Sequence, residues 1–222
     1  MIPIKDDNPR AGFPFMTIGL LIANVMVFYF EITMGYTPVI EKYALYSVDI
    51  VNGQNLQTLI TSMFLHGGIM HLVGNMLYLW IFGDNVESYL GHVKFIFFYL
   101  ITGLCAAFAH IFLSGISDVP MVGASGAISG VLGAYLIKYP RANVLVIIPI
   151  IYFITVRRIP ALIVLGFWFL LQLFYGLAAT SVEGGGIAFW AHVGGFLGGM
   201  LLINVFPAKR RRKRDSDYLP MR

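Results

Sequence analysis

The sequence has few charged residues and almost no cysteine. Only 12% of its 222 residues are charged, whereas 58% are hydrophobic, and the mean hydropathy is +0.78. Soluble domains contain about 25% charged residues, so the composition excludes an ordinary soluble domain and indicates a membrane protein. A single cysteine, Cys105, excludes an internal disulfide framework. The first apolar segment lacks a small-residue cleavage site, so we interpret it as a retained span rather than a signal peptide.

Six apolar stretches predict six membrane-spanning helices, and several of them approach the roughly 20 residues needed to cross a bilayer. We expect the spans near residues 13–32, 69–82, 93–113, 122–138, 161–179 and 187–206. The chain then divides into a flexible cytoplasmic lead (1–12), a membrane domain (13–206) and a basic tail (207–222). The expected fold class is an all-α polytopic membrane protein.

Three segments between the spans are polar or interrupted. Residues 34–57 are too polar to span and too apolar to float free, so we expect them to rest in the membrane interface. Asp84–His92 is interpreted as a short charged loop. Val144–Val156 is apolar and β-branched, but it is short and Pro149 interrupts it. For residues 139–160 we therefore predict an interfacial or partly embedded excursion rather than a seventh span.

The basic residues are unequally distributed between the two sides of the predicted bundle. With six spans, 14 of the 15 lysines and arginines fall on one side, and only Lys42 falls on the other. The positive-inside rule makes the basic side cytoplasmic, so both termini are expected there. The run Lys209–Arg214 is typical of an anchor for anionic lipids of the bilayer, and we expect no nucleic-acid partner.

Small residues surround one serine and one histidine in the predicted spans. Gly123–Gly130 has almost no side-chain bulk and carries Ser125, while Ala191–Gly199 is similarly small and carries His192. Glycine and alanine allow helix backbones to approach closely in lipid. If these two helices pack face to face, Ser125 and His192 come within reach of each other.

The predicted topology places four polar residues at a similar depth in the outer half of the membrane: His71, Asn75, Ser125 and His192. Polar groups are costly at that depth and mark functional sites by default. A serine hydroxyl becomes a nucleophile when a base takes its proton, and His192 is a suitable base near neutral pH. His71 and Asn75 share one helix face and, with the Ser125 N–H, are placed to donate to the oxyanion that forms.

Each of these residues also has a simpler explanation. Small-residue patterns occur in membrane helices for packing alone, a lone serine often bonds its own helix, and His71 and Asn75 can tie two helices together. His66 and His71 lack the i,i+4 spacing of a helical metal site, and no carboxylate lies near them in sequence, so no metal or cofactor is predicted. No carboxylate is placed to orient His192 either. The sequence therefore predicts a dyad whose orientation comes from packing.

Three ordered motifs cover the membrane region: His66–Met76 in the second span, Gly123–Ala127 in the fourth and Ala191–Gly199 in the sixth. Glu87–Gly91 follows the second span. In these motifs the chain resembles the rhomboid family of intramembrane serine proteases, of the prokaryotic six-span type. The resemblance implies a six-helix bundle around a water-filled cavity that opens to the outside, in a prokaryotic cell membrane.

The resemblance also implies an activity and its residues. Members cut transmembrane protein substrates near the outer face of the bilayer and favour small residues before the scissile bond. By this resemblance Ser125 is the nucleophile and His192 the general base, while His71, Asn75 and the Ser125 N–H bind the oxyanion. Because the chain has both Ser125 and His192, we expect it to be active.

The chain departs from some family members at two places. Residues 34–57 contain no Trp-Arg pair, so the first loop must be anchored differently. Ser129 stands where some members place a tyrosine that stacks on the histidine, which leaves the support of the His192 ring open. As a further hypothesis, a gate and cap for substrate entry come from a set of residues in and after the fifth span: Phe167, Trp168, Phe169, Phe174 and Gly184–Gly186.

Two alternative functions stay open at this point. A catalytically inactive rhomboid-like chaperone or trafficking factor would bind transmembrane helices without cutting them, and loss of Ser125 would not affect it. A small transporter would use histidine and asparagine as a proton relay, and this function predicts internal repeats. The two halves of the sequence show no convincing repeat.

Overall fold

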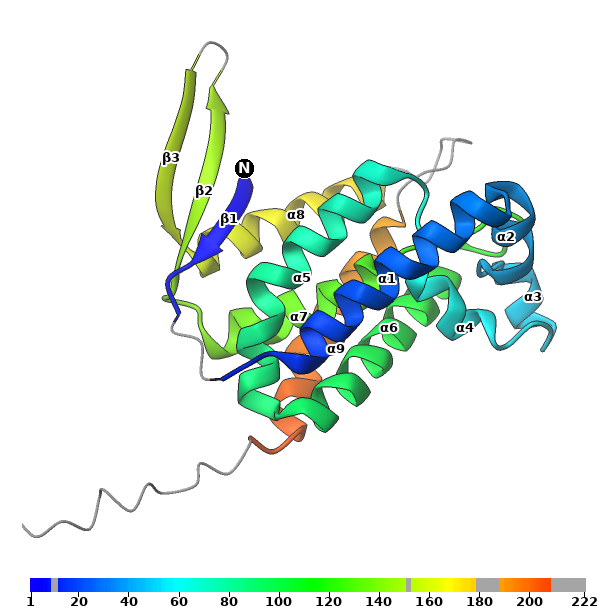
Figure 1. The fold of residues 1–222 in the computed structure, drawn as a ribbon, viewed down its shortest axis with the longest axis horizontal. Coiled ribbons are helices and arrows are strands. Elements are labelled where there is room, and N and C mark those ends of the chain that lie inside the picture. Colours follow the sequence, from blue (N-terminus) through cyan, green and yellow to red (C-terminus); the bar gives the residue numbers. More distant parts are fainter. Residues whose placement is uncertain (9–11, 151–152, 179–187, 209–222) are drawn as a thin grey trace, which may run out of the picture.

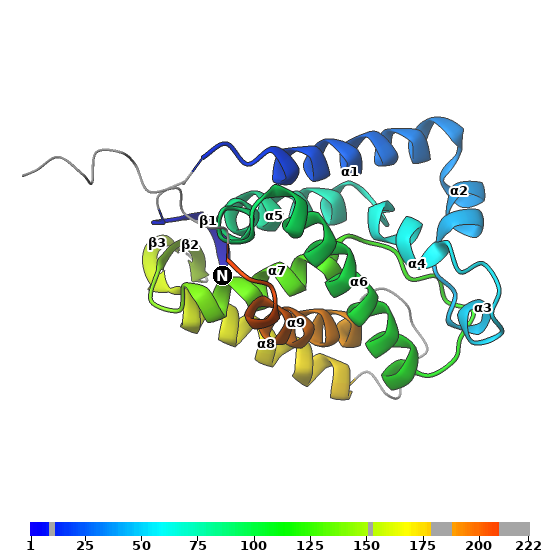
Figure 2. The same cartoon turned by 90° about the horizontal axis from the view of Figure 1, so that it is seen from below.

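A computed structural model of the chain describes residues 1–8, 12–150, 153–178 and 188–208. It is a helical bundle with a small sheet that projects from one end (Figure 1). In the turned view, α1 and α8 lie on opposite sides of the bundle, with α5, α6, α7 and α9 between them (Figure 2). The longer helices of the described residues are α1 (Phe15–Met34), α5 (Ile69–Leu90), α6 (His92–Ser114), α7 (Ser125–Lys138), α8 (Ala161–Ala178) and α9 (Phe189–Val205).

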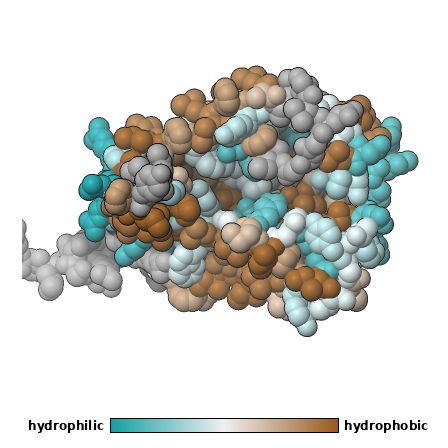
Figure 3. Space-filling view, turned by 90° about the horizontal axis from the view of Figure 1, so that it is seen from above, coloured by the Kyte–Doolittle hydropathy of each residue, from teal (hydrophilic) through white to brown (hydrophobic). Residues whose placement is uncertain are grey.

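Some of these helices are long and apolar enough to cross a bilayer. Within the described ranges α1, α6 and α8 meet both conditions by themselves. The helical segments Thr58–Phe64 and Ile69–Leu90 (α5) are long and apolar enough when taken together, and they are bent by 92° at the break between them. Counted as one broken span, they form a fourth crossing. The helices α7, with 14 residues, and α9, with 17, are shorter. The expected count of six spans is therefore not confirmed, although the chain is a multi-pass integral membrane protein. Hydrophobic residues cover much of the face in Figure 3, with many hydrophilic ones toward its two ends.

A series of short helices connects α1 with α5. These are α2 (Tyr36–Tyr43), α3 (Ser47–Val51), α4 (Thr58–Thr61) and the 3-10 helix η1 (Ser62–Phe64). Two small apolar clusters hold α2, α3 and α4 to the bundle. Val39 and Ile40 of α2 pack with Val27 of α1. Ile50 of α3 and Leu59 of α4 pack against a cluster that contains Ala107 and Ile111 of α6. None of the short helices has the length of a span, which agrees with the expectation of a region that does not cross.

The expectation of an all-α fold is wrong at the sheet. The strands β2 (Asn143–Ile150) and β3 (Phe153–Pro160) pair antiparallel, and β1 (Ile2–Asp6) pairs with the other edge of β2. Residues 2–6 are thus a strand and not a flexible lead, and the excursion predicted at 139–160 contains the two strands Asn143–Ile150 and Phe153–Pro160. β-Branched and aliphatic side chains suit a pleated surface, and Val144 and Val146 are fully buried against the bundle.

A polar cluster fixes the sheet to the helices. The buried carboxylate of Asp6 in β1 accepts hydrogen bonds from the Tyr135 hydroxyl in α7 at 2.7 Å and from Asn85 Nδ2 in α5 at 2.9 Å. Burial raises the pKa of Asp6 above its ordinary value.

The first helical N–H groups of α8, at Ala161 and Leu162, donate to the carbonyls of Ala142 and Pro140. The start of α8 is therefore tied to the sheet and to the segment after α7.

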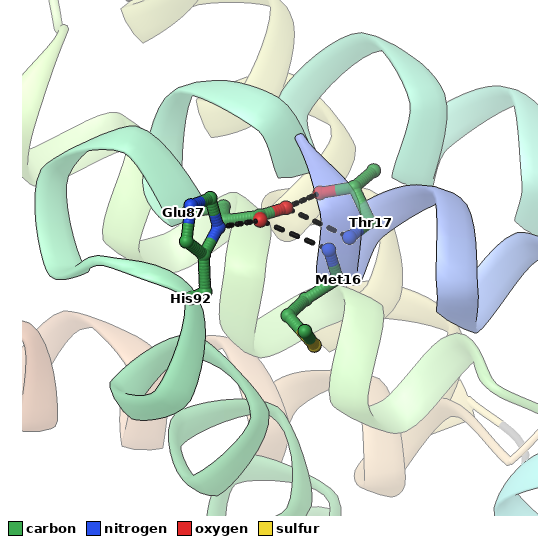
Figure 4. A network of polar contacts seen from close by, with 4 residues as sticks. All are labelled: Met16, Thr17, Glu87 and His92. Carbon is green, nitrogen blue, oxygen red and sulfur yellow. Dashed lines mark hydrogen bonds and ion pairs between the residues drawn. The ribbon is translucent and has the colours of Figure 1, made fainter. Parts of the chain in front are cut away.

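The expected charged loop at 84–92 is instead mostly helix, because its polar groups find partners inside the fold. The helix α5 continues to Leu90, and Glu87 is buried near its end (1% exposed). The Glu87 carboxylate accepts hydrogen bonds from the N–H groups of Met16 and Thr17, from the Thr17 hydroxyl, and it contacts His92 (Figure 4). A carboxylate at the first turn of α1 satisfies free N–H groups and interacts favourably with the helix dipole. Glu87 thus joins α1, α5 and α6.

The helices α7 and α9 approach until their backbones touch. A Cβ placed on Gly199 would overlap the carbonyl oxygen of Gly130, and one on Gly195 would overlap that of Gly126. A glycine of α7 makes the equivalent contact with the backbone of α9, since a Cβ on Gly133 would overlap the carbonyl oxygen of Phe196. This confirms the expectation, drawn from the two small-residue segments, that these helices pack face to face.

We predict that Gly199→Ala lowers the free energy of unfolding by about 3 kcal/mol, at the upper end of overpacking effects, because a backbone atom cannot rotate away. Gly166→Ala in α8 is the matched control, since a Cβ there meets nothing within 4 Å. Thermal unfolding in detergent measures both variants. Equal stability of Gly199→Ala and wild type would contradict the backbone contact.

Candidate active site

The structure brings Ser125 and His192 together across the contact between α7 and α9. Ser125 is the first residue of α7, and His192 lies in the first turn of α9. The Ser125 Oγ is 2.9 Å from His192 Nε2. At this distance a hydroxyl donates a hydrogen bond to an imidazole nitrogen, which is the geometry of a nucleophile and its base.

His71 lies near Ser125, on the other side of Gly123. Its Nδ1 accepts a hydrogen bond from the Gly67 N–H at 3.2 Å, so in the neutral ring the proton is on Nε2. A Cβ on Gly123 would lie 2.8 Å from His71 Nε2 and 3.4 Å from Ser125 Oγ. Gly123 also has a φ of 128°, where other residues are strained. Glycine at this position lets the donor face of His71 approach the serine.

Asn75 and the backbone of Ser125 supply further donors. Asn75 is 7% exposed, and its Nδ2 is a buried donor that finds no hydrogen-bond partner among the described residues. A buried amide without a partner is costly and needs an explanation. Ser125 N–H belongs to the first turn of α7, whose N–H groups have no partner within the helix. Both groups suit an acceptor that arrives with a ligand.

The turn before α5 holds His71 in place. The buried Glu31 of α1 accepts a hydrogen bond from the His66 N–H at 3.1 Å, and the His66 and His71 rings meet edge to face with centroids 5.2 Å apart. No group of three or more metal-ligating side chains occurs in the part of the chain that the structure describes. Glu31 and His66 thus serve as supports of the turn.

Sequence reasoning missed the group that orients His192. The Oε1 of Gln172 in α8 lies 2.8 Å from His192 Nδ1, and Trp168 covers the ring with centroids 5.8 Å apart. No carboxylate was predicted near His192, and the Ser129 hydroxyl donates to the Ser125 carbonyl rather than supporting the ring. The available signal was Gln172 itself, the one amide side chain in the apolar run Ala161–Ala178.

The space beside Ser125 is small. A cavity of about 20 Å³ adjoins Ser125 and is lined mainly by small or flexible side chains, including Met63, Gly103, Ala106 and Gly126. A volume of this size holds about one water molecule. Only a small side chain fits beside the hydroxyl without movement of the walls.

The four aromatic residues proposed as a gate differ in their surroundings. Phe167 and Phe174 are 48% and 64% exposed on α8, whereas Trp168 contacts His192 and Phe169 stacks on Phe196 at 4.7 Å. The glycine-rich segment proposed as a cap, 184–186, lies outside the described residues.

These features define a class: a multi-pass membrane protein with a serine–histidine pair inside a helical bundle. A family model described as the rhomboid domain matches residues 53–209. The chain therefore belongs to the rhomboid family, as its motifs indicated.

Individual relatives agree with this assignment. The chain is 28% identical over 208 residues to "Rhomboid protein 1, mitochondrial" of Saccharomyces cerevisiae, which covers 90% of this chain and 56% of the yeast protein. It is 30% identical over 204 residues to "Rhomboid protease GluP" of Bacillus subtilis, covering 86% of this chain and 34% of that protein. "Presenilin-associated rhomboid-like protein A, mitochondrial" of Danio rerio is 34% identical over 110 residues, 48% of this chain and 29% of that protein. The chain spans about half the length of these relatives or less.

If the site cleaves peptide bonds and Asn75 is an oxyanion donor, Asn75→Ala is expected to lower kcat about 100-fold and to leave KM nearly unchanged, because such a donor acts only in the transition state. The assay is cleavage of a single-span substrate in proteoliposomes. Asn24→Ala removes another buried amide, whose Nδ2 donates to the Leu20 carbonyl in α1, and serves as the control. A kcat within twofold of wild type for Asn75→Ala would exclude the oxyanion role.

Proposed function

We propose that the protein is an intramembrane serine endopeptidase. The observation that carries the proposal is the 2.9 Å contact between Ser125 Oγ and His192 Nε2. Membership of the rhomboid family supports it, as does the likeness to a relative named a rhomboid protease.

The residues divide the reaction among them. Ser125 Oγ attacks the carbonyl carbon of the scissile bond while its proton passes to His192 Nε2. The oxyanion then receives hydrogen bonds from His71 Nε2–H, Asn75 Nδ2 and the Ser125 N–H. His192 returns the proton to the leaving amine, the peptide bond breaks, and an acyl ester on Ser125 remains. His192 next takes a proton from water, which hydrolyses the ester and regenerates the serine.

The short α7 supports a site below the outer membrane surface. A helix rises 1.5 Å per residue, so the 14 residues of α7 extend about 21 Å, less than the hydrocarbon thickness of about 30 Å. If Lys138 is near the cytoplasmic surface, Ser125 begins the helix inside the membrane and water must reach it from outside. In this arrangement all six longer helices cross or enter the bilayer, and both termini are cytoplasmic.

The substrates we propose are transmembrane proteins, cut near the outer face of the bilayer. The cavity of about 20 Å³ beside Ser125 favours a small side chain before the scissile bond. The excess of lysine and arginine on one side supports the orientation with cytoplasmic termini. For the compartment we propose a prokaryotic cell membrane, although the relatives include mitochondrial as well as bacterial proteins.

Cleavage of a model single-span substrate in proteoliposomes tests the proposal. Wild type is expected to cut, whereas Ser125→Ala and His192→Ala are expected to lose at least about 1,000-fold in kcat, since each removes a member of one catalytic unit. Equal thermal stability of the three proteins is the control for folding. Cutting that survives Ser125→Ala would end the serine-protease proposal. An inactive wild type whose Ser125 also fails to react with a fluorophosphonate would favour the non-catalytic chaperone.

The gate hypothesis gives a prediction that separates two neighbours on α8. Phe167→Ala is expected to raise turnover a few-fold in bilayers, because the exposed ring is a barrier to lateral entry and its loss leaves the dyad intact. Trp168→Ala is expected to lower turnover, because it uncovers the His192 ring. Turnover in proteoliposomes, compared with that of a soluble peptide in detergent, measures the effect. Unchanged turnover of a folded Phe167→Ala would count against this gate.

A further inference from the structure

His192 is held between two helices besides its own. Its Nε2 contacts Ser125 of α7, and its Nδ1 contacts Gln172 of α8 at 2.8 Å. Trp168, four residues before Gln172, lies on the same face of α8 and covers the ring. The ring is therefore fixed on both nitrogen atoms and on one side.

The contact with Gln172 determines which nitrogen of His192 carries the proton. An amide oxygen only accepts hydrogen bonds, so Nδ1 must be the donor and must hold the proton of the neutral ring. Nε2 then has its lone pair free toward the Ser125 hydroxyl. This is the tautomer that a general base needs, and the third member of a catalytic triad enforces the same one.

We propose that Gln172 is a positioning residue that keeps His192 in its working tautomer and orientation. The site is then a serine–histidine–glutamine arrangement rather than an unsupported dyad. The proposal rests on the proposed serine endopeptidase activity. Because Gln172 belongs to α8, the base is fully oriented only while α8 lies against α9.

The start of α8 is firmly attached to the rest of the fold, so the orientation of His192 depends on the position of the outer part of α8, which carries Gln172. Its start is bonded to the segment after α7, and Ala161 and Leu165 are fully buried there. Gln172 lies 11 residues further on, about 17 Å along the helix. Beyond it, α8 meets α9 through side chains, such as Tyr175 against Phe189. Displacement of the outer part of α8 by an entering substrate separates Gln172 from His192, and return of the helix restores the bond.

Two substitutions of Gln172 test the proposal by cleavage of a single-span substrate between pH 5 and 9. Gln172→Leu is expected to lower kcat by about 10- to 100-fold, the size of effects from groups that orient a reactive imidazole, and to leave KM within about twofold. Gln172→Glu keeps an acceptor and is expected to retain turnover above neutral pH. Its carboxylate stabilises the imidazolium, so deprotonation of the base requires a higher pH, and the acid limb of the rate profile moves up by about one pH unit. Leu170→Ala, at an exposed position of the same helix, is the control.

A second measurement does not depend on turnover. Nitrogen NMR of isotope-labelled histidine, assigned by comparison with His192→Ala, reports the tautomer of His192 directly. Wild type is expected to carry the proton on Nδ1, and Gln172→Leu is expected to show a mixture. Unchanged kcat, pH profile and tautomer in a folded Gln172→Leu would overturn the proposal while leaving the protease function standing. A wild type that keeps the Nδ1 proton, cuts nothing and does not react with a fluorophosphonate at Ser125 would instead reject the protease function alone.

Discussion

The backbone contact between α7 and α9 is the constraint on which the candidate site depends. Any residue other than glycine at position 195 or 199 would push α7 and α9 apart, because its Cβ would overlap a backbone carbonyl of α7. This separation would increase the distance between Ser125 and His192. In a bilayer, helices gain little from burying apolar surface, because lipid is as apolar as the side chains. Close van der Waals contact is then the main source of attraction, and the glycines provide it at the place where the geometry must be most exact.

Some buried polar side-chain atoms of the described residues have a partner in the fold, and four have none: Asn24 Oδ1, His66 Nε2, Asn75 Nδ2 and Tyr99 OH. Glu87 accepts hydrogen bonds from two N–H groups and a hydroxyl at the start of α1, while Glu31 in α1 accepts one from the His66 N–H before α5, and both fix helix ends in position. Asn75 Nδ2 lacks a partner, next to a histidine whose donor nitrogen faces the serine. The hydrogen-bonded carboxylates of Glu31 and Glu87 keep the helices in fixed positions. The Asn75 amide, which has no partner in the fold, remains available to a ligand.

Much of this arrangement was accessible from the sequence, since helices, small-residue faces and single polar residues in apolar runs all leave local patterns. Sequence reasoning could not find the sheet, because the strand Ile2–Asp6 pairs with residues far along the chain and the lead appeared only polar. It took Asp84–His92 for a loop because its charges were judged without their partners in α1 and α6. The contact between Gln172 and His192 could not be predicted from the sequence, because it depends on how α8 packs against α9. In each case the deciding information was a contact between distant segments.

The sheet has a consequence for how the protein is made. The strand β1 is synthesised before α1, whereas its partner β2 is made only after α1, α5, α6 and α7. Contacts between such distant segments form late and slowly. Both strands must also end on the same side of the membrane, so a helix inserted in the wrong direction would leave strand edges unpaired and open to aggregation. Pairing of the three strands therefore requires that the helices between β1 and β2 have the correct orientation in the membrane.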